Sequence, residues 1–164
     1  MRVGRGIPAS GTDTAGLDKN WALYVLSAKA VGFRVGGYWR FFPLPDFTWQ
    51  VNSFCDRLTS VPLQLPPLVD IEDAQELGQA ELTDWAIRVL TGVERATGKV
   101  PLLYTNRSFL NTRVDATRLT RWPLALARWT LEPAWPVEQP VFWQYTGNSR
   151  VPWATGPVDL QRAH

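Results

Sequence analysis

The chain has 164 residues, enough for one domain with a hydrophobic core of its own. Its 20% charged and 45% hydrophobic residues are typical of a globular protein, and a net charge of +2 is too small to predict a nucleic-acid partner. No run of 18 apolar residues predicts a membrane span, and Gly-rich sequence follows Met1 and Arg2, so no signal peptide is visible.

The scarcity of cysteine and histidine limits the chemistry available. Cys55 is the only cysteine, which excludes an internal disulfide, and it adjoins an apolar stripe, so we expect a buried thiol rather than a nucleophile. The only histidine is His164, the last residue, and no His/Cys cluster suits zinc. Carboxylates are therefore the expected catalytic groups, and we expect neither a metal nor a cofactor.

Strands and helices alternate along the first two thirds of the chain. The pattern predicts a strand at 2–6, a helix at 17–31 ended by Gly32, a strand at 33–42 that contains Gly36 and Gly37, and a helix at 47–58 capped by Asp46. A strand at 68–72 follows, and then a helix whose apolar stripe runs from Leu82 to Val93 and which ends at Gly98.

The last third contains strands with little helix between them. These predicted strands cover residues 100–106, 124–129, 141–145 and 156–160. Strands that alternate with helices predict an α/β protein with a parallel sheet, and the helix-poor end suggests a barrel whose last strands lose their helices. In such barrels the catalytic groups lie at the carboxyl ends of the strands, where the strand at 68–72 places its last residues.

The most informative motif is LVDIED at residues 68–73. Residues two apart in a strand point to the same face, so Asp70 and Glu72 project side by side while Ile71 faces the opposite way. Two neighbouring carboxyls repel each other, so one should titrate high and keep its proton. A protonated acid beside an ionised partner is what glycosidic bond cleavage requires, although the triplet alone also fits a solvated acidic turn.

Five segments, in this order and at these distances, resemble the glycoside hydrolase family 25 lysozymes, the muramidases of phage endolysins and bacterial autolysins. They are AVGFRVGGY at 30–38, LVDIE at 68–72, GKVPLLYTN at 98–106, VFWQYT at 141–146 and GPVDL at 156–160. The resemblance implies one catalytic domain over residues 1–164 and an irregular TIM-like (β/α)5β3 barrel. It also implies hydrolysis of the β-1,4 bond between N-acetylmuramic acid and N-acetylglucosamine in bacterial peptidoglycan, with no cofactor.

The resemblance also assigns roles to individual residues. Glu72 matches the general acid that protonates the leaving oxygen, and Asp70 matches the carboxylate that stabilises positive charge at the sugar. Either the acetamido group of the substrate or a carboxylate acting directly would relieve that charge. Asp159 matches an acidic residue at the last strand end. Aromatic or hydroxyl-bearing wall positions of the groove are matched by Tyr38, Tyr104, Trp143 and Tyr145.

Each of these secondary assignments has a structural alternative. Asp159 could be an exposed loop carboxylate, Tyr104 and Tyr145 could fill the barrel interior, and Trp143 could belong to the core, with Gln144 on the other face of its strand. The family offers no counterpart for Trp39, Trp129 and Trp135, which we expect in the core or on the surface.

One departure from the family pattern concerns the N-terminus. These lysozymes normally begin with a strand that carries an Asp-x-Ser motif, whereas residues 1–6 already resemble the second strand of the family. We therefore expect a barrel without its first strand, which could self-associate through its exposed edge.

Three functions follow from this reading. The first is a phage-encoded endolysin, made in the host cytoplasm and acting on the cell wall. The second is a catalytically impaired glycan-binding or structural relative that has lost the first-strand Asp. A different barrel glycosidase, such as a chitinase, fits less well because those enzymes carry a longer acidic motif than residues 70–72.

Overall fold

The computed structural model describes residues 2–5, 16–44, 46–129, 140–152 and 155–163. His164 and Trp135 lie outside the described residues. In chain order the elements are β1 (Arg2–Arg5), α1 (Trp21–Ala30), β2 (Tyr38–Phe41), α2 (Thr48–Thr59), β3 (Leu68–Ile71), α3 (Gln79–Thr97), β4 (Leu102–Asn106), α4 (Arg107–Thr112), the 3-10 helix η1 (Ala116–Leu119), β5 (Leu124–Ala127), β6 (Phe142–Ser149) and β7 (Val158–Ala163).

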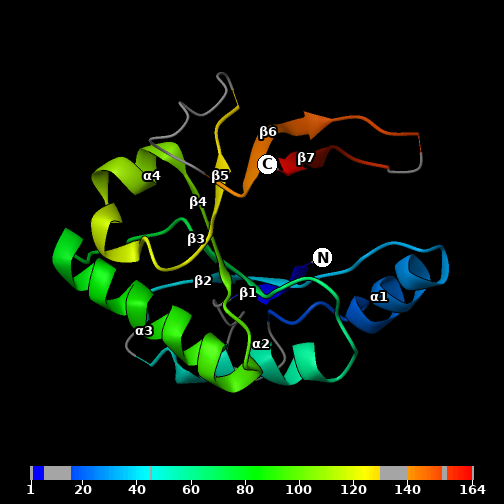
Figure 1. The fold of residues 1–164 in the computed structure, drawn as a ribbon, viewed down its shortest axis with the longest axis horizontal. Helices are drawn as coiled ribbons and strands as arrows, with labels where there is room; N and C mark the ends of the chain where they lie inside the picture. Colours follow the sequence, from blue (N-terminus) through cyan, green and yellow to red (C-terminus); the bar gives the residue numbers. More distant parts are fainter. Residues whose placement is uncertain (1, 6–15, 45, 130–139, 153–154, 164) are drawn as a thin grey trace.

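The seven strands form one sheet in the order of the chain. Strands β1 to β6 pair in parallel, and β7 returns antiparallel to β6. The predicted α/β class is confirmed, and among the described residues no helix follows β5, as the helix-poor final third predicted. The sheet curves so that the β6–β7 hairpin lies across from β1 (Figure 1).

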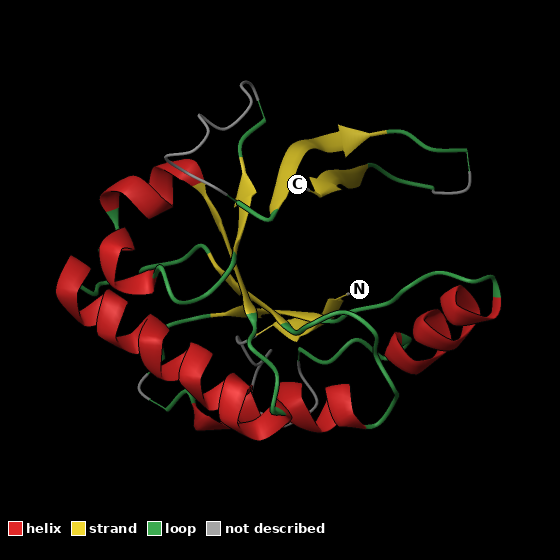
Figure 2. Cartoon of the chain, viewed as in Figure 1, coloured by secondary structure: helices red, strands yellow, loops and turns green. Residues whose placement is uncertain are grey.

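The core lies between the sheet and the helices that surround its outer face (Figure 2). On β2 and β3 the residues of odd number, such as Trp39, Phe41 and Ile71, are buried in the same core cluster as residues of α2 and α3. The Phe54 ring of α2 packs edge-on against Phe41, with 5.8 Å between ring centroids. The predicted stripe of α3 is buried at Leu82, Trp85, Ala86, Val89, Leu90 and Val93.

Local signals placed most helix ends correctly. Gly98 ends α3 in the left-handed conformation, with φ of 66°, and Gly32 follows α1 with φ of 86°. Asp46 does not cap α2 at its N-cap position, which is Phe47. Its carboxylate instead accepts a hydrogen bond from the Thr48 backbone N–H at 2.9 Å, in a turn just before the helix.

The strand predicted at 33–42 is wrong in its first half, because β2 begins only at Tyr38. The backbone of the preceding residues is bonded to a loop instead of a neighbouring strand. The Val35 carbonyl accepts hydrogen bonds from the N–H groups of Gln64 and Leu65, each at 3.1 Å. Gly36 and Gly37, which weaken a strand, mark the boundary in the sequence, because β2 begins at the next residue.

Cys55 lies in the core, as expected. Burial, assisted by the neighbouring charge of Asp56, raises the pKa of its thiol to about 11. The thiol therefore stays protonated at neutral pH and is a poor nucleophile.

Side chains from α1, α2 and β1 crowd the backbone at Gly37, the residue just before β2. A Cβ atom added to Gly37 would lie 2.6 Å from Leu58 Cδ2 and 2.8 Å from side-chain atoms of Trp21 and Val3. These neighbours are themselves buried, so they have little room to move.

We expect Gly37→Ala to lower the free energy of unfolding by about 1–3 kcal/mol, because the methyl group overpacks this junction. Gly156→Ala is the matched control, since nothing lies within 4 Å of a Cβ there. Urea unfolding of both variants measures the difference. Equal stability of the two variants would show that the junction can expand.

Candidate active site

The concave face of the sheet holds a cavity of about 290 Å³, called here the central cavity. Its lining residues are Tyr38, Arg40, Phe42, Leu68, Asp70, Glu72, Tyr104, Gln144, Asp159 and Gln161. Along β2 and β3 the lining residues are two positions apart, and between neighbouring strands they are paired in register. Arg40 is paired in register with Asp70, and Asp70 with Tyr104, so the three side chains lie on one face in adjacent strands.

Asp70 and Glu72 both line the central cavity, whereas Ile71 between them is buried in the core. This is the arrangement that the two-residue period of a strand predicts. The two carboxyls differ in environment. Asp70 is buried, and its Oδ1 atom has no hydrogen-bond partner among the described residues. Glu72 stands just beyond the end of β3, and its side chain keeps 22% of its surface exposed.

Burial raises the pKa of Asp70 from 3.8 to about 8. The negative charge of Glu72 is the second cause, and that of Asp159 adds to it, while the Arg40 guanidinium opposes the rise. One acid of the pair therefore titrates high, as expected for neighbouring carboxyls. In the free protein at neutral pH the proton resides on Asp70.

Glu72 is held by two long contacts. Asn106 Nδ2 donates to Oε1 at 3.5 Å, and Arg40 Nη1 lies 3.7 Å from Oε2. Neither contact is short enough to fix the carboxylate firmly. Glu72 can therefore turn toward a ligand in the cavity.

Tyr104 and Gln144 form the floor of the central cavity. The Tyr104 hydroxyl donates a hydrogen bond to Gln144 Oε1, and Gln144 is almost fully buried. Burial and the negative charges of Glu72, Asp70 and Asp159 raise the pKa of the Tyr104 phenol above its usual value, so the group is neutral. Tyr104 can therefore donate or accept hydrogen bonds but cannot act as a base at neutral pH.

The other predicted site residues divide into two groups. Tyr38 lines the central cavity from β2, and Asp159 reaches it from β7, where its side chain is exposed. Trp143 and Tyr145 are not among the lining residues. They lie on the opposite face of β6 from Gln144, with their ring centroids 5.7 Å apart, and Trp143 Nε1 donates to the Arg128 carbonyl at 2.8 Å.

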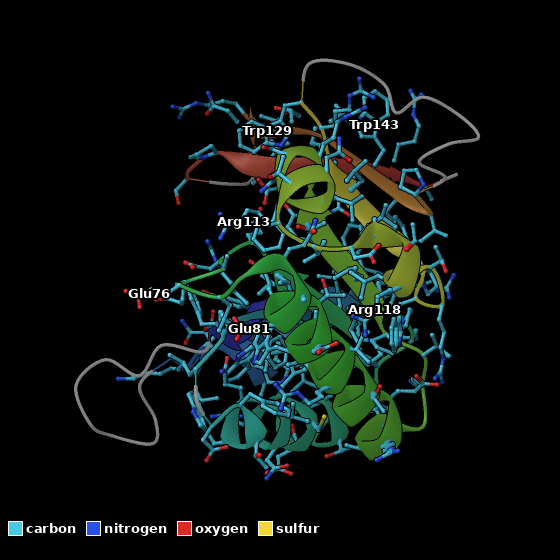
Figure 3. All side chains as sticks on the ribbon, turned by 90° about the vertical axis from the view of Figure 1, so that its left-hand side faces the viewer. Glu76, Glu81, Arg113, Arg118, Trp129 and Trp143 are labelled. Carbon is cyan, nitrogen blue, oxygen red and sulfur yellow. The ribbon has the colours of Figure 1, made fainter. Side chains whose placement is uncertain are left out.

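The remaining tryptophans are split between core and surface. Trp39 is fully buried, while Trp129 is 63% exposed and lies against Gly147. Figure 3 shows Trp129 and Trp143 at the same end of the molecule, near the C-terminal strands.

Sequence reasoning missed five lining residues, which are Arg40, Phe42, Leu68, Gln144 and Gln161. A signal was present for Arg40 and Phe42, because they follow Tyr38 at steps of two along the same strand direction. No such local signal marked Gln144, whose place in the cavity depends on the pairing of β6 with β5 and β7.

Within the described ranges, no three His, Cys, Asp or Glu side chains are arranged to hold a metal ion. None of the described helices combines the length and apolar character needed to cross a bilayer.

Comparison with known proteins identifies the family. The profile of Glycosyl hydrolases family 25 matches residues 9–153. The chain belongs to this family. The segments quoted for the resemblance and the cavity that contains Asp70 and Glu72 fall largely within the matched region.

Individual relatives are distant and longer than this chain. The Escherichia coli K12 protein YegX, whose name carries no assigned function, is 26% identical over 148 residues, which cover 87% of this chain and 51% of YegX. The spore cortex lytic enzyme SleM of Clostridium perfringens aligns with a TM-score of 0.82 at 23% identity, over 99% of this chain and 58% of SleM. The CTP1L endolysin aligns with a TM-score of 0.81 at 22% identity, over 99% of this chain and 56% of CTP1L.

These alignments show that the fold is shared with family 25 proteins. The chain spans about half the length of the curated relatives that it matches.

The raised pKa of Asp70 makes stability depend on pH. The folded protein holds a proton on Asp70 up to about pH 8, whereas the unfolded chain loses it near pH 4. Between these values the folded state binds more protons than the unfolded state, so the free energy of unfolding falls as pH rises.

We expect Asp70→Asn to remove this contribution, which amounts to at most about 1.4 kcal/mol per pH unit. The variant should be more stable than the parent at pH 9 and should show a flatter slope between pH 5 and 7.5, measured by urea unfolding. Glu76→Gln, an exposed loop carboxylate labelled in Figure 3, is the control. Identical slopes for parent and Asp70→Asn would contradict the buried proton.

Proposed function

We propose that this chain is a lysozyme that hydrolyses the β-1,4 bond between N-acetylmuramic acid and N-acetylglucosamine in bacterial peptidoglycan. The observation that carries the proposal is the pair of Asp70 and Glu72 in the central cavity of a family 25 chain. Two structural neighbours support it, since SleM is described as a spore cortex lytic enzyme and CTP1L as an endolysin.

The carboxyl pair supplies one proton for the leaving oxygen and one negative charge to stabilise the cationic sugar, and these are the two groups that the reaction needs. In the free protein the proton is on Asp70. A bound glycan excludes water from Glu72, which favours its neutral form, and the positive charge developing at the sugar favours ionised Asp70. Because the two sites are coupled, substrate binding shifts the proton to Glu72.

Glu72 then protonates the leaving oxygen as the glycosidic bond breaks. The positive charge at the anomeric carbon is relieved by the acetamido group of the substrate or by Asp70 itself. Water completes the reaction by adding its hydroxide to the anomeric carbon and returning its second proton to the carboxyl pair. Asp159, at the rim of the cavity, adds negative charge that favours the cationic transition state.

The aromatic residues contribute in two places. Tyr38 and Tyr104 contact the sugars inside the central cavity. Trp143 and Tyr145 lie on the other face of β6, so they contact only glycan that extends beyond the cavity.

We expect Glu72→Gln to lower the rate of peptidoglycan solubilisation by about two orders of magnitude or more, since general acid catalysis contributes about 10²–10⁴. Glu76→Gln, a carboxylate four residues away in an exposed loop, should keep the parent rate. Circular dichroism verifies that both variants are folded. Near-parental activity of Glu72→Gln would remove Glu72 from the site.

The same assay distinguishes the glycan-binding alternative. A parent protein that sediments with peptidoglycan but releases no reducing ends would replace the proposed hydrolase with a binding domain.

We further propose that the protein is a phage-type endolysin that acts on the bacterial cell wall. Its likeness to the CTP1L endolysin supports this, and the net charge of +2 suits an anionic wall.

We also propose that two copies of the chain associate. The sheet has two edges, β1 and β7, and the β1 edge is partly satisfied because the Asp18 N–H donates to the Val3 carbonyl at 2.9 Å. Beside β7 an apolar groove of about 990 Å³ is bounded by the end of α1 and by Phe142 of β6. An apolar surface, called here the α1 face, adjoins it and consists of Leu23, Tyr24, Leu26, Val31 and Phe33, all exposed.

A second copy of the chain is the occupant that fits this surface. The α1 helix buries only Trp21 and Val25, and its large side chains Leu23, Tyr24 and Leu26 are exposed. Because groove and α1 face are adjacent, two copies related by a two-fold axis can cover both at once.

We expect light scattering after size exclusion to give about twice the 18.5 kDa mass of one chain at micromolar concentration. Leu26→Glu should give the monomer, because it places a charge in the apolar contact. Asn52→Glu on α2, an exposed position far from the α1 face, is the control and should stay dimeric. A parent protein that is monomeric throughout would disprove the contact.

A further inference from the structure

Arg40 is the only cationic side chain among the described residues that line the central cavity. It projects from the middle of β2, opposite Asp70, and 42% of its side-chain surface is exposed. Its guanidinium carbon lies 5.4 Å from the centroid of the Phe42 ring. Stacking on this ring restricts the orientation of the guanidinium without using its hydrogen-bond donors.

The protein uses few of those donors. A guanidinium has five N–H groups. The Nε atom of Arg40 is buried and has no hydrogen-bond partner among the described residues, and Nη1 lies 3.7 Å from Glu72 Oε2, longer than a hydrogen bond. The exposed part of the guanidinium therefore has donors to offer a ligand in the cavity, while the hydrogen-bonding capacity of Nε stays unused by the described residues.

The charge around Arg40 restricts what that acceptor can be. Three carboxyls, Asp70, Glu72 and Asp159, line the same cavity. Glu72 and Asp159, whose negative charges help to raise the pKa of Asp70, repel an anionic ligand everywhere except beside the guanidinium. A planar fork of donors matches a carboxylate, with which it forms two parallel charge-assisted hydrogen bonds.

We propose that Arg40 binds a carboxylate carried on the lactyl arm of the substrate's N-acetylmuramic acid, and so selects acidic over neutral β-1,4 amino-sugar strands. This rests on the proposed function and adds a specificity contact to it. The carboxylate has two sources, the free lactyl group of peptide-free strands and the stem peptide that is otherwise attached there. Attachment of a stem peptide converts the lactyl carboxyl to an amide, so the carboxylates of the peptide lie farther from the sugar ring than the free lactyl group does.

The test compares substrates that differ in the carboxylates they carry. Peptide-free glycan strands, the same strands with lactyl carboxylates converted to methylamides, and strands that retain their stem peptides are cleaved by parent protein and variants. For the parent, we expect kcat/KM to be about 10- to 100-fold higher on the carboxylate strands than on the amidated ones, through KM, as charge-assisted bonds imply.

In Arg40→Gln this ratio should fall to about one, and Arg40→Lys should retain part of it. Arg88→Gln is the matched control, because Arg88 also lies 5.4 Å from a phenylalanine ring, that of Phe47, but on the outer side of α3. Its ratio should equal that of the parent. Since each ratio is taken within one protein sample, loss of folded protein does not alter it.

The possible results distinguish the source of the carboxylate, the role of Arg40 and the proposed function. A preference for strands with stem peptides but not for free lactyl strands assigns the bound carboxylate to the peptide. A parent ratio near one, or an Arg40→Gln ratio equal to the parent's, overturns the proposal and leaves Arg40 as a neighbour of Glu72 only. A parent protein that cleaves none of the strands overturns the proposed function instead, and calorimetric binding of the same strands then tests Arg40 alone.

Discussion

The site depends on a parallel sheet that is covered by helices on one face only. The outer face is filled by Trp39, Phe41, Val69 and Ile71, which are packed against α2 and α3. Strand alternation then requires the residues between them to point the other way, toward the central cavity. The same packing that stabilises the fold therefore aligns Arg40, Asp70 and Tyr104 across three adjacent strands. A shift of one residue in any of these strands would exchange core and cavity residues.

Burial of Asp70 in this sheet disfavours its ionised form, and the resulting rise in its pKa suits the proposed chemistry. Asp70 sits where water is largely excluded, without a hydrogen bond to Oδ1 from the described residues, and this holds its proton at neutral pH. Glu72, two residues later, is more exposed and loosely held. Two carboxyl groups thus differ in environment because one lies within the sheet and the other at its end. Such a difference is what acid-assisted glycoside cleavage needs.

Arg40 and the α1 face are the two features that family membership by itself does not explain. The first places a positive charge among three carboxyls, and the second leaves large apolar side chains in contact with solvent. Exposed apolar surface is unfavourable for an isolated chain, and so is the Arg40 Nε–H, which is buried without a hydrogen-bond partner among the described residues. A ligand for one and a second copy for the other would remove these costs. The two features lie at separate places and can be altered independently.

The sequence alone determined what depends on neighbours along the chain. The two-residue period placed Asp70 and Glu72 together with Ile71 opposite, the 3.6-residue period defined the buried stripe of α3, and Gly98 marked its end. Ordered segments also identified the family. Only the tertiary structure decided which strands meet. Gln144 reaches the central cavity, Trp143 and Tyr145 do not, and the proton resides on Asp70, because strand register and burial are set by residues distant in sequence.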